Sequence, residues 1–103
     1  MLIREKDRLE LLRIFDTAAV PITVWAYGSR VKGSAHKGSD LDLVIRSQNL
    51  SPIPTDIFSD LYDKIKDSNI PILVDLKDWA LVPENFRKNI REQYEVLYET
   101  PNP

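Results

Sequence analysis

The sequence predicts a single α+β domain built in two layers, with a mixed β-sheet and helices packed mainly on one side of it. Helical and extended hydrophobic patterns alternate along the chain, and no repeat or low-complexity segment interrupts them. With 103 residues, of which 43% are hydrophobic, the chain can bury one core. We therefore expect residues 1–103 to form one domain, too small to hold a catalytic lobe and a separate lobe for a second substrate.

The first half of the chain is expected to contain one long helix and two strands. Residues 4–18 carry apolar side chains at helical spacing, and Pro21 limits this helix at its end. An apolar run over residues 22–27 predicts the first strand, which leads through a Gly-Ser turn into a short helix over residues 30–35. The second strand is expected over residues 40–46, before a polar loop that contains proline.

The second half is expected to add two helices and two strands. Thr55 can cap a helix with an apolar stripe at helical spacing. A β-rich run predicts the third strand over residues 72–76. Pro83 suits the first turn of the last helix, and the alternation of residues 94–98 indicates a final strand.

Two aspartates stand two positions apart within the second expected strand. Residues i and i+2 of a strand face the same side, so Asp40 and Asp42 would present two carboxylates about 6–7 Å apart. Mg²⁺ prefers carboxylates together with substrate phosphates, and two such ions about 3.5–4 Å apart can clamp the attacking and leaving oxygens of a phosphoryl displacement. Such a site needs a third acid on a neighbouring strand. We expect this acid to be Asp75, a charge within a β-rich run that otherwise has no reason to hold one.

The turn after the first strand is suited to bind phosphate. Gly28 would let the backbone approach a phosphate closely, and the Ser29 hydroxyl could donate a hydrogen bond to it. We therefore interpret Gly28 and Ser29 as a triphosphate cradle, with Arg30 and Lys32 as candidate phosphate neighbours. The segment is not a P-loop, because Ser34 stands where a Walker A sequence has lysine.

Composition narrows the classes of partner. Fourteen basic against sixteen acidic residues give a net charge of −2, which disfavours direct nucleic-acid binding through a broad positive field. The absence of cysteine excludes disulfides and thiolate metal sites. No apolar run reaches the roughly 18 residues of a membrane span, and no signal-peptide core follows the first residues. We expect a cytoplasmic protein without a membrane partner.

These motifs together resemble the signature of the minimal nucleotidyltransferases, small members of the DNA polymerase beta-like nucleotidyltransferase superfamily. The residues that carry the resemblance are Gly28-Ser29, Gly33, Ser39-Asp40-x-Asp42-Leu43 and Asp75. The resemblance implies a nucleotidyltransferase palm fold, with Ser39 in the nucleotide-binding motif. It also implies that Asp40 and Asp42 are metal ligands and that Asp75 is the third catalytic acid, near the attacking hydroxyl.

The resemblance further implies substrates and a partner. Proteins of this kind are commonly the antitoxin of a pair with a helical HEPN ribonuclease toxin, and they resemble enzymes that transfer AMP to a tyrosine of that toxin. We therefore expect a nucleotidyltransferase that uses two Mg²⁺ ions and moves NMP, as AMP from ATP, onto a hydroxyl of a partner protein. Two alternatives stay open. One is a non-catalytic antitoxin that binds nucleotide and acts by occlusion, and the other is a transferase for a small molecule or an RNA end.

Overall fold

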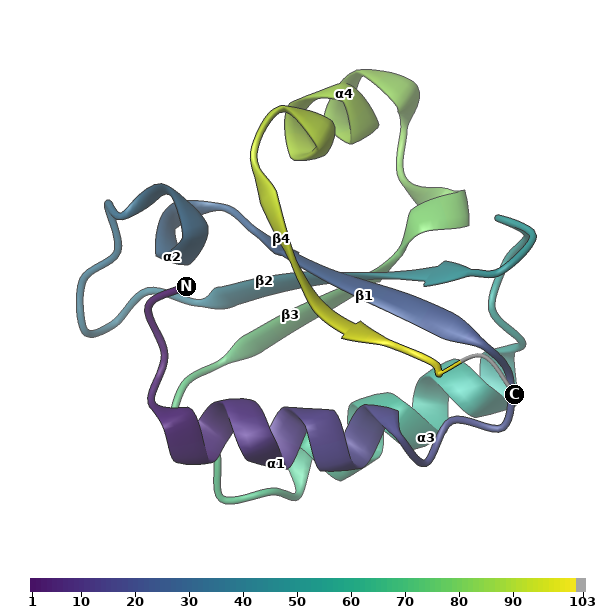
Figure 1. Ribbon diagram of the computed structural model, residues 1–103, viewed down its shortest axis with the longest axis horizontal. Coiled ribbons are helices and arrows are strands. Elements are labelled where there is room, and N and C mark those ends of the chain that lie inside the picture. Colours follow the sequence, from purple (N-terminus) through teal and green to yellow (C-terminus); the bar gives the residue numbers. More distant parts are fainter. Residues whose placement is uncertain (102–103) are drawn as a thin grey trace.

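The computed structural model describes residues 1–101, whose strands form one mixed four-stranded sheet (Figure 1). In chain order the elements are α1 (Glu5–Phe15), β1 (Ile22–Tyr27), α2 (Ser29–Lys32), β2 (Leu41–Ser47), α3 (Thr55–Lys66), β3 (Val74–Asp78), the 3₁₀ helix η1 (Trp79–Leu81), α4 (Glu84–Glu92) and β4 (Tyr94–Glu99). The strand order is β3-β2-β1-β4. Strand β1 is antiparallel to β2 and β4, whereas β2 and β3 are parallel. The predicted α+β fold with a mixed sheet is confirmed.

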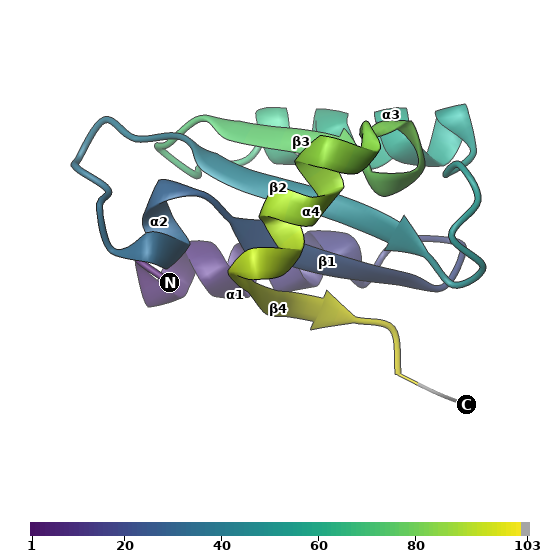
Figure 2. The same ribbon diagram turned by 90° about the horizontal axis from the view of Figure 1, so that it is seen from above.

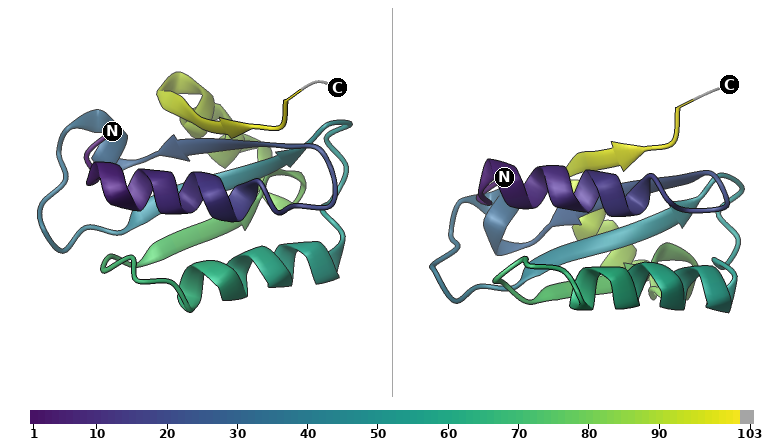
Figure 3. Two further views of the ribbon diagram at one scale, coloured as in Figure 1. Left: turned by 60° about the horizontal axis from the view of Figure 1, so that its bottom comes forward. Right: turned by 90° about the horizontal axis from the view of Figure 1, so that it is seen from below.

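The helices cover the two faces of the sheet unequally. Helices α1 and α3 lie side by side on one face, as Figure 3 shows from below. Helix α4 crosses the opposite face (Figure 2), and α2 lies at the end of the sheet where β1 stops. The expectation of helices mainly on one side therefore holds for α1 and α3, and α4 is the exception. Within residues 1–101, none of the helices has the length and apolar character needed to span a membrane.

Alternating side chains of β1 and β2 supply a hydrophobic core on each face, because successive residues of a strand point to opposite sides. Val24 and Leu43 belong to the larger core under α1 and α3. Trp25 and Val44 belong to a second core on the other face, together with Ile90 of α4. The second core holds α4 over the face that also carries Asp42, two positions before Val44.

The structure corrects the bounds of the first helix and of the helix around residue 30. Helix α1 ends at Phe15 rather than residue 18, and the Thr17 hydroxyl donates a 2.6 Å hydrogen bond to the Ile14 carbonyl oxygen in the turn that follows. Helix α2 ends at Lys32 rather than residue 35, because Gly33 adopts a left-handed conformation (φ 83°) that closes the helix.

The structure also corrects two predictions in the second half. Strand β3 covers Val74–Asp78 rather than residues 72–76, because its pairing with β2 continues to Asp78. The buried Asp78 carboxylate accepts hydrogen bonds from the backbone N–H groups of Ile53 (2.8 Å) and Ala80 (3.0 Å), which explains a charged residue at the end of this strand. Thr55 is the first residue of α3 rather than its cap, since the N-cap position is held by Pro54.

Candidate active site

Gly28 connects β1 to α2 at a point where a side chain has no room. Its φ of 80° lies in the left-handed region, and a Cβ built on it would stand 2.3 Å from Oδ2 of Asp42. The close approach follows from the antiparallel pairing of Tyr27 with Asp42, which brings the end of β1 against β2. The backbone of this turn therefore packs directly against the Asp42 carboxylate.

Asp42 and Asp75 lie opposite each other on the parallel strands β2 and β3. Adjacent strands are about 4.8 Å apart, so this register places two carboxylates together on one face of the sheet. Asp40 is exposed and immediately precedes β2. Within residues 1–101, no three acidic side chains come close enough to hold one ion jointly. The structure thus forms the pair of Asp42 and Asp75 and leaves Asp40 at its border.

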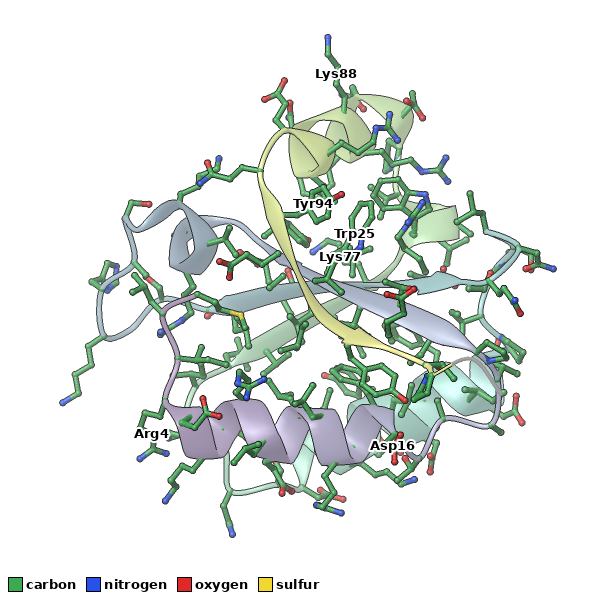
Figure 4. The ribbon with its side chains drawn as sticks, viewed as in Figure 1. Arg4, Asp16, Trp25, Lys77, Lys88 and Tyr94 are labelled. Carbon is green, nitrogen blue, oxygen red and sulfur yellow. The ribbon has the colours of Figure 1, made fainter. Side chains whose placement is uncertain are left out.

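The electrostatics of this pair favour a bound cation. Burial and, next, the negative charge of Asp75 raise the pKa of Asp42, whereas the ammonium of Lys77 opposes this shift and Asp40 adds to it. Nζ of Lys77 lies 2.5 Å from Oδ2 of Asp75, on the face that also carries Trp25 (Figure 4). The Lys77 ammonium therefore faces the carboxylates of Asp42 and Asp75. Their oxygen atoms are the donors that Mg²⁺ prefers, so the residues fit the predicted metal.

A cavity of about 830 Å³ opens beside these carboxylates. Gly28, Asp42 and Asp75 border it on the side of the sheet, Lys32 borders it from α2, and α4 contributes residues such as Asn89. Binding sites for small molecules have volumes of about 300–1,000 Å³. The cavity is therefore large enough for a nucleotide.

Sequence comparison places these residues in a known family. Residues 10–102 match a family model described as Polymerase beta, Nucleotidyltransferase. The chain belongs to this nucleotidyltransferase family. A Haemophilus influenzae protein named probable protein adenylyltransferase MntA is 42% identical to it over 98 residues, which cover 92% of this chain and 82% of MntA.

Solved structures of toxin–antitoxin complexes share the fold of this nucleotidyltransferase. One structure, a toxin–antitoxin with AMP-PNP, has a TM-score of 0.70 at 22% identity and covers 95% of this chain and 75% of that chain. A mutant MntA-HpeT toxin–antitoxin structure has a TM-score of 0.69 at 20% identity, with the same coverage. At this identity, the likeness establishes the architecture of the domain.

Arg30 has a structural place in this nucleotidyltransferase. Its guanidinium donates from Nε and Nη2 to the carbonyl oxygen of Ser39 (3.0 and 2.7 Å) and from Nη1 to that of Leu2 (2.6 Å). The side chain is buried and does not border the cavity. The hydrogen bonds of Arg30 hold the segment that precedes Asp40. The position of Arg30 therefore does not support the predicted contact with phosphate.

The other predicted nucleotide-binding residues are distributed around the cavity. Lys32 and Gly28 border it. Ser29 begins α2 directly after Gly28, and the Ser39 hydroxyl accepts a 3.0 Å hydrogen bond from the backbone N–H of His36. Neither serine borders the cavity, so their predicted contacts with a nucleotide remain predictions.

The residues that border the cavity of this nucleotidyltransferase and that sequence reasoning missed include Tyr27, Lys77 and Asn89. The Tyr27 hydroxyl is buried without a hydrogen-bond partner among residues 1–101, and burial followed by the charges of Asp42 and Asp75 raises its pKa. Lys77 could have been found, because it follows Asp75 by two positions on the same strand. Asn89 could not have been found from the sequence, because nothing in the local pattern indicates which face of the sheet α4 covers.

Replacing Lys77 by methionine should strengthen the binding of Mn²⁺ in the absence of nucleotide, because the ammonium competes with a metal ion for Asp75. The two side chains are 38% and 42% exposed, so we expect the free energy of unfolding to fall by less than about 1 kcal/mol. Calorimetric titration with MnCl₂ measures the affinity. Lys64→Met is the matched control, since it breaks an exposed pair with Asp60 on α3. An unchanged Mn²⁺ affinity in Lys77→Met would show that Lys77 does not compete.

Proposed function

We propose that this protein is a Mg²⁺-dependent adenylyltransferase that moves AMP from ATP to a hydroxyl group of a partner toxin, and that the toxin is a helical protein of the HEPN type. One observation carries the proposal: the Gly28 backbone, Asp42 and Asp75 meet at the border of a cavity of nucleotide size. The identity of 42% with a relative named probable protein adenylyltransferase MntA supports the reaction. The shared fold with toxin–antitoxin structures, one of them with AMP-PNP, supports the choice of nucleotide and partner.

The acids divide two tasks between them in this proposal. Asp40 and Asp42 would hold the metal ions, and Asp75 would either bind an ion or accept the proton of the attacking hydroxyl. Bound Mg²⁺ would supply positive charge to the phosphates as negative charge develops on them. Burial, followed by the charge of Asp75, raises the pKa of Asp42, and this agrees with the assignment because a bound cation would stabilise a carboxylate that is partly desolvated and lies beside another carboxylate.

The phosphates lie against the turn after β1 in this proposal. The Gly28 backbone and the Ser29 hydroxyl hold the triphosphate, and Lys32 adds a positive charge from α2. The acceptor oxygen attacks the α-phosphorus, the bond between the α- and β-phosphates breaks, and pyrophosphate leaves. The proton of the acceptor hydroxyl passes to Asp75 or to water, which balances the reaction.

The acceptor comes from another protein in this proposal. The chain forms one sheet with its helices, and its core is distributed over the two faces of that sheet, without a second lobe within residues 1–101 that could enclose another substrate. The open cavity beside α4 leaves the carboxylates approachable by a hydroxyl presented on a protein surface.

Intact mass spectrometry tests this proposal. The purified protein is incubated with ATP and Mg²⁺, alone and with its cognate toxin, and the mass of each chain is recorded. We expect one or a few AMP increments on the toxin, none on the protein alone, and none in EDTA. A toxin that stays inhibited without a change in mass would favour occlusion. Transfer to a free aminoglycoside or to an RNA end without the toxin would overturn the proposed acceptor.

A further inference from the structure

Three arginines and two tryptophans gather on the α4 face of the sheet, outside the cavity. We call the set of Arg46, Arg87, Arg91, Trp25 and Trp79 the arginine–tryptophan surface. The guanidinium carbon of Arg46 lies 4.1 Å from the ring centroid of Trp25 and 4.9 Å from that of Trp79. The guanidinium carbons of Arg87 and Arg91 lie 5.4 and 5.5 Å from the Trp79 centroid. Three guanidinium groups therefore lie close to the indole rings of Trp25 and Trp79.

The aromatic part of this surface is fixed by the fold. Trp25 stacks on Tyr94 of β4 with 3.9 Å between ring centroids (Figure 4), and it meets the edge of Trp79 at 5.3 Å. Trp25 and Trp79 are only 7% and 3% exposed. Arg46 consequently packs against two buried rings, and a group held in place beforehand loses less entropy when a ligand binds.

The positive charge of the arginine–tryptophan surface exceeds the negative charge beside it. Glu84 pairs with two of the arginines, at 2.6 Å from Nη2 of Arg91 and 3.7 Å from Nη1 of Arg87. Arg46 takes part in no ion pair among residues 1–101, and its Nε is buried without a hydrogen-bond partner. Burial lowers the pKa of Arg46, Tyr94 opposes this shift, and Arg91 and Arg87 add to it. Residues 1–101 therefore provide no anion that pairs with the Arg46 cation.

The arginine–tryptophan surface lies within reach of any protein that occupies the catalytic cavity. Asp42 and Arg46 are four residues apart on β2 and face the same side, which separates their backbones by about 13 Å. A protein interface of ordinary size buries about 800 Å² on each partner and is wider than this distance. A protein that presents a hydroxyl at Asp42 would then also cover Arg46.

We propose that the arginine–tryptophan surface binds a carboxylate side chain of the acceptor protein, and so positions that protein for transfer. This inference rests on the proposed function, because it assumes that the acceptor is a protein. A guanidinium presents its N–H groups in a planar fork that matches the two oxygens of a carboxylate, and arginine and tryptophan dominate the binding energy of many interfaces. Nucleic acid is a poorer fit, because the chain has a net charge of −2 and carries Asp42 and Asp75 on the same face.

Binding of the cognate toxin without nucleotide tests the inference by calorimetry at low and high NaCl concentration. Arg46→Met keeps most of the aliphatic bulk between the tryptophans and removes the charge. We expect it to weaken toxin binding about tenfold or more and to reduce the dependence of binding on salt, with the affinity for ATP unchanged. Arg13→Met is the matched control, since Arg13 is exposed on α1, across the sheet. Wild-type affinity in Arg46→Met would overturn the inference.

Two further variants keep the test decisive. Arg91→Met removes a partly exposed charge from the same surface and serves if Arg46→Met does not fold; wild-type affinity in this variant would then overturn the inference. Arg46→Glu should lose toxin binding and regain it when one toxin carboxylate is changed to arginine, which identifies the bound side chain. Failure of every such exchange would overturn the inference.

The outcomes separate this inference from the proposed function. Because the binding measurement contains no ATP, a toxin that binds through Arg46 without being adenylylated would contradict the proposed function and leave the docking surface standing. Normal adenylylation with unchanged affinity in the arginine variants would contradict the docking surface alone. A single-stranded RNA of 12 nucleotides serves as a probe in fluorescence anisotropy, and Arg46-dependent RNA binding without any effect on the toxin would overturn the inference.

Discussion

With Asp42 changed to asparagine, the proposed transfer of AMP to the partner is expected to fall by about 1,000-fold or more in kcat/KM, or about 4 kcal/mol of transition-state stabilisation. The amide keeps the shape of the side chain but carries no charge for a metal ion. Asp42 is also the carboxylate against which the Gly28 backbone is pressed, so the geometry of the turn should survive the change. Initial rates of AMP incorporation into the toxin, measured over a range of Mg²⁺ concentrations, give the comparison.

The same variant should be at least as stable as the wild type at pH 7 in the absence of metal. The pKa of Asp42 is raised in the folded protein, so its ionisation costs stability as the pH rises through that pKa, and a neutral amide avoids this cost. Thermal unfolding followed by circular dichroism measures the difference. Asp60→Asn on α3 is a matched control that should leave transfer unchanged. Full transfer by Asp42→Asn, or transfer that is insensitive to EDTA, would refute the metal assignment.

Changing Gly28 to alanine is expected to lower the affinity for ATP by more than about tenfold, which is 1.4 kcal/mol. The added Cβ would stand 2.3 Å from Oδ2 of Asp42, so the carboxylate or the turn must move. Either movement disturbs the backbone that we propose holds the triphosphate. Calorimetry with a non-hydrolysable ATP analogue measures the affinity on protein that is shown to be folded.

Gly33 provides the matched control for this prediction. Its φ of 83° is close to the 80° of Gly28, but a Cβ built on Gly33 meets no atom within 4 Å. Gly33→Ala should therefore cost only the left-handed conformation, about 1–2 kcal/mol of stability, and should leave ATP affinity intact. Equal losses of affinity in the two variants would mean that backbone strain, and not the contact with Asp42, is responsible.

Local patterns were sufficient for much of the fold. Strand β1 was predicted with its observed bounds, and β4 was placed to within one residue, because their hydrophobic patterns are local. The bounds of β3 were wrong by two residues at each end. Its last residue, Asp78, is held by the backbone of Ile53, which is 25 residues away and cannot be inferred from neighbouring residues.

Local sequence patterns were enough to propose those parts of the candidate site that lie close together in the chain. The turn at Gly28 follows a strand and Asp42 lies within another, so the rules of local geometry were enough to predict both positions. Asp40 was predicted on the same strand as Asp42 but lies just before it, because β2 covers Leu41–Ser47 rather than residues 40–46. The sequence also indicated that Asp75 belongs on a neighbouring strand. The structure places it opposite Asp42. The role of Asp75 in the reaction stays a prediction.

The other side chains around these acids are brought there by long-range packing. The placement of α4 over the second core brings Asn89 to the cavity. Long-range hydrogen bonds hold the Arg30 side chain in the interior. The packing also brought Arg46 against both Trp25 and Trp79, which are 54 positions apart in the chain. The physical reason is the same in each case: these contacts depend on the packing of elements against each other, and the period of a single helix or strand contains no information about that packing.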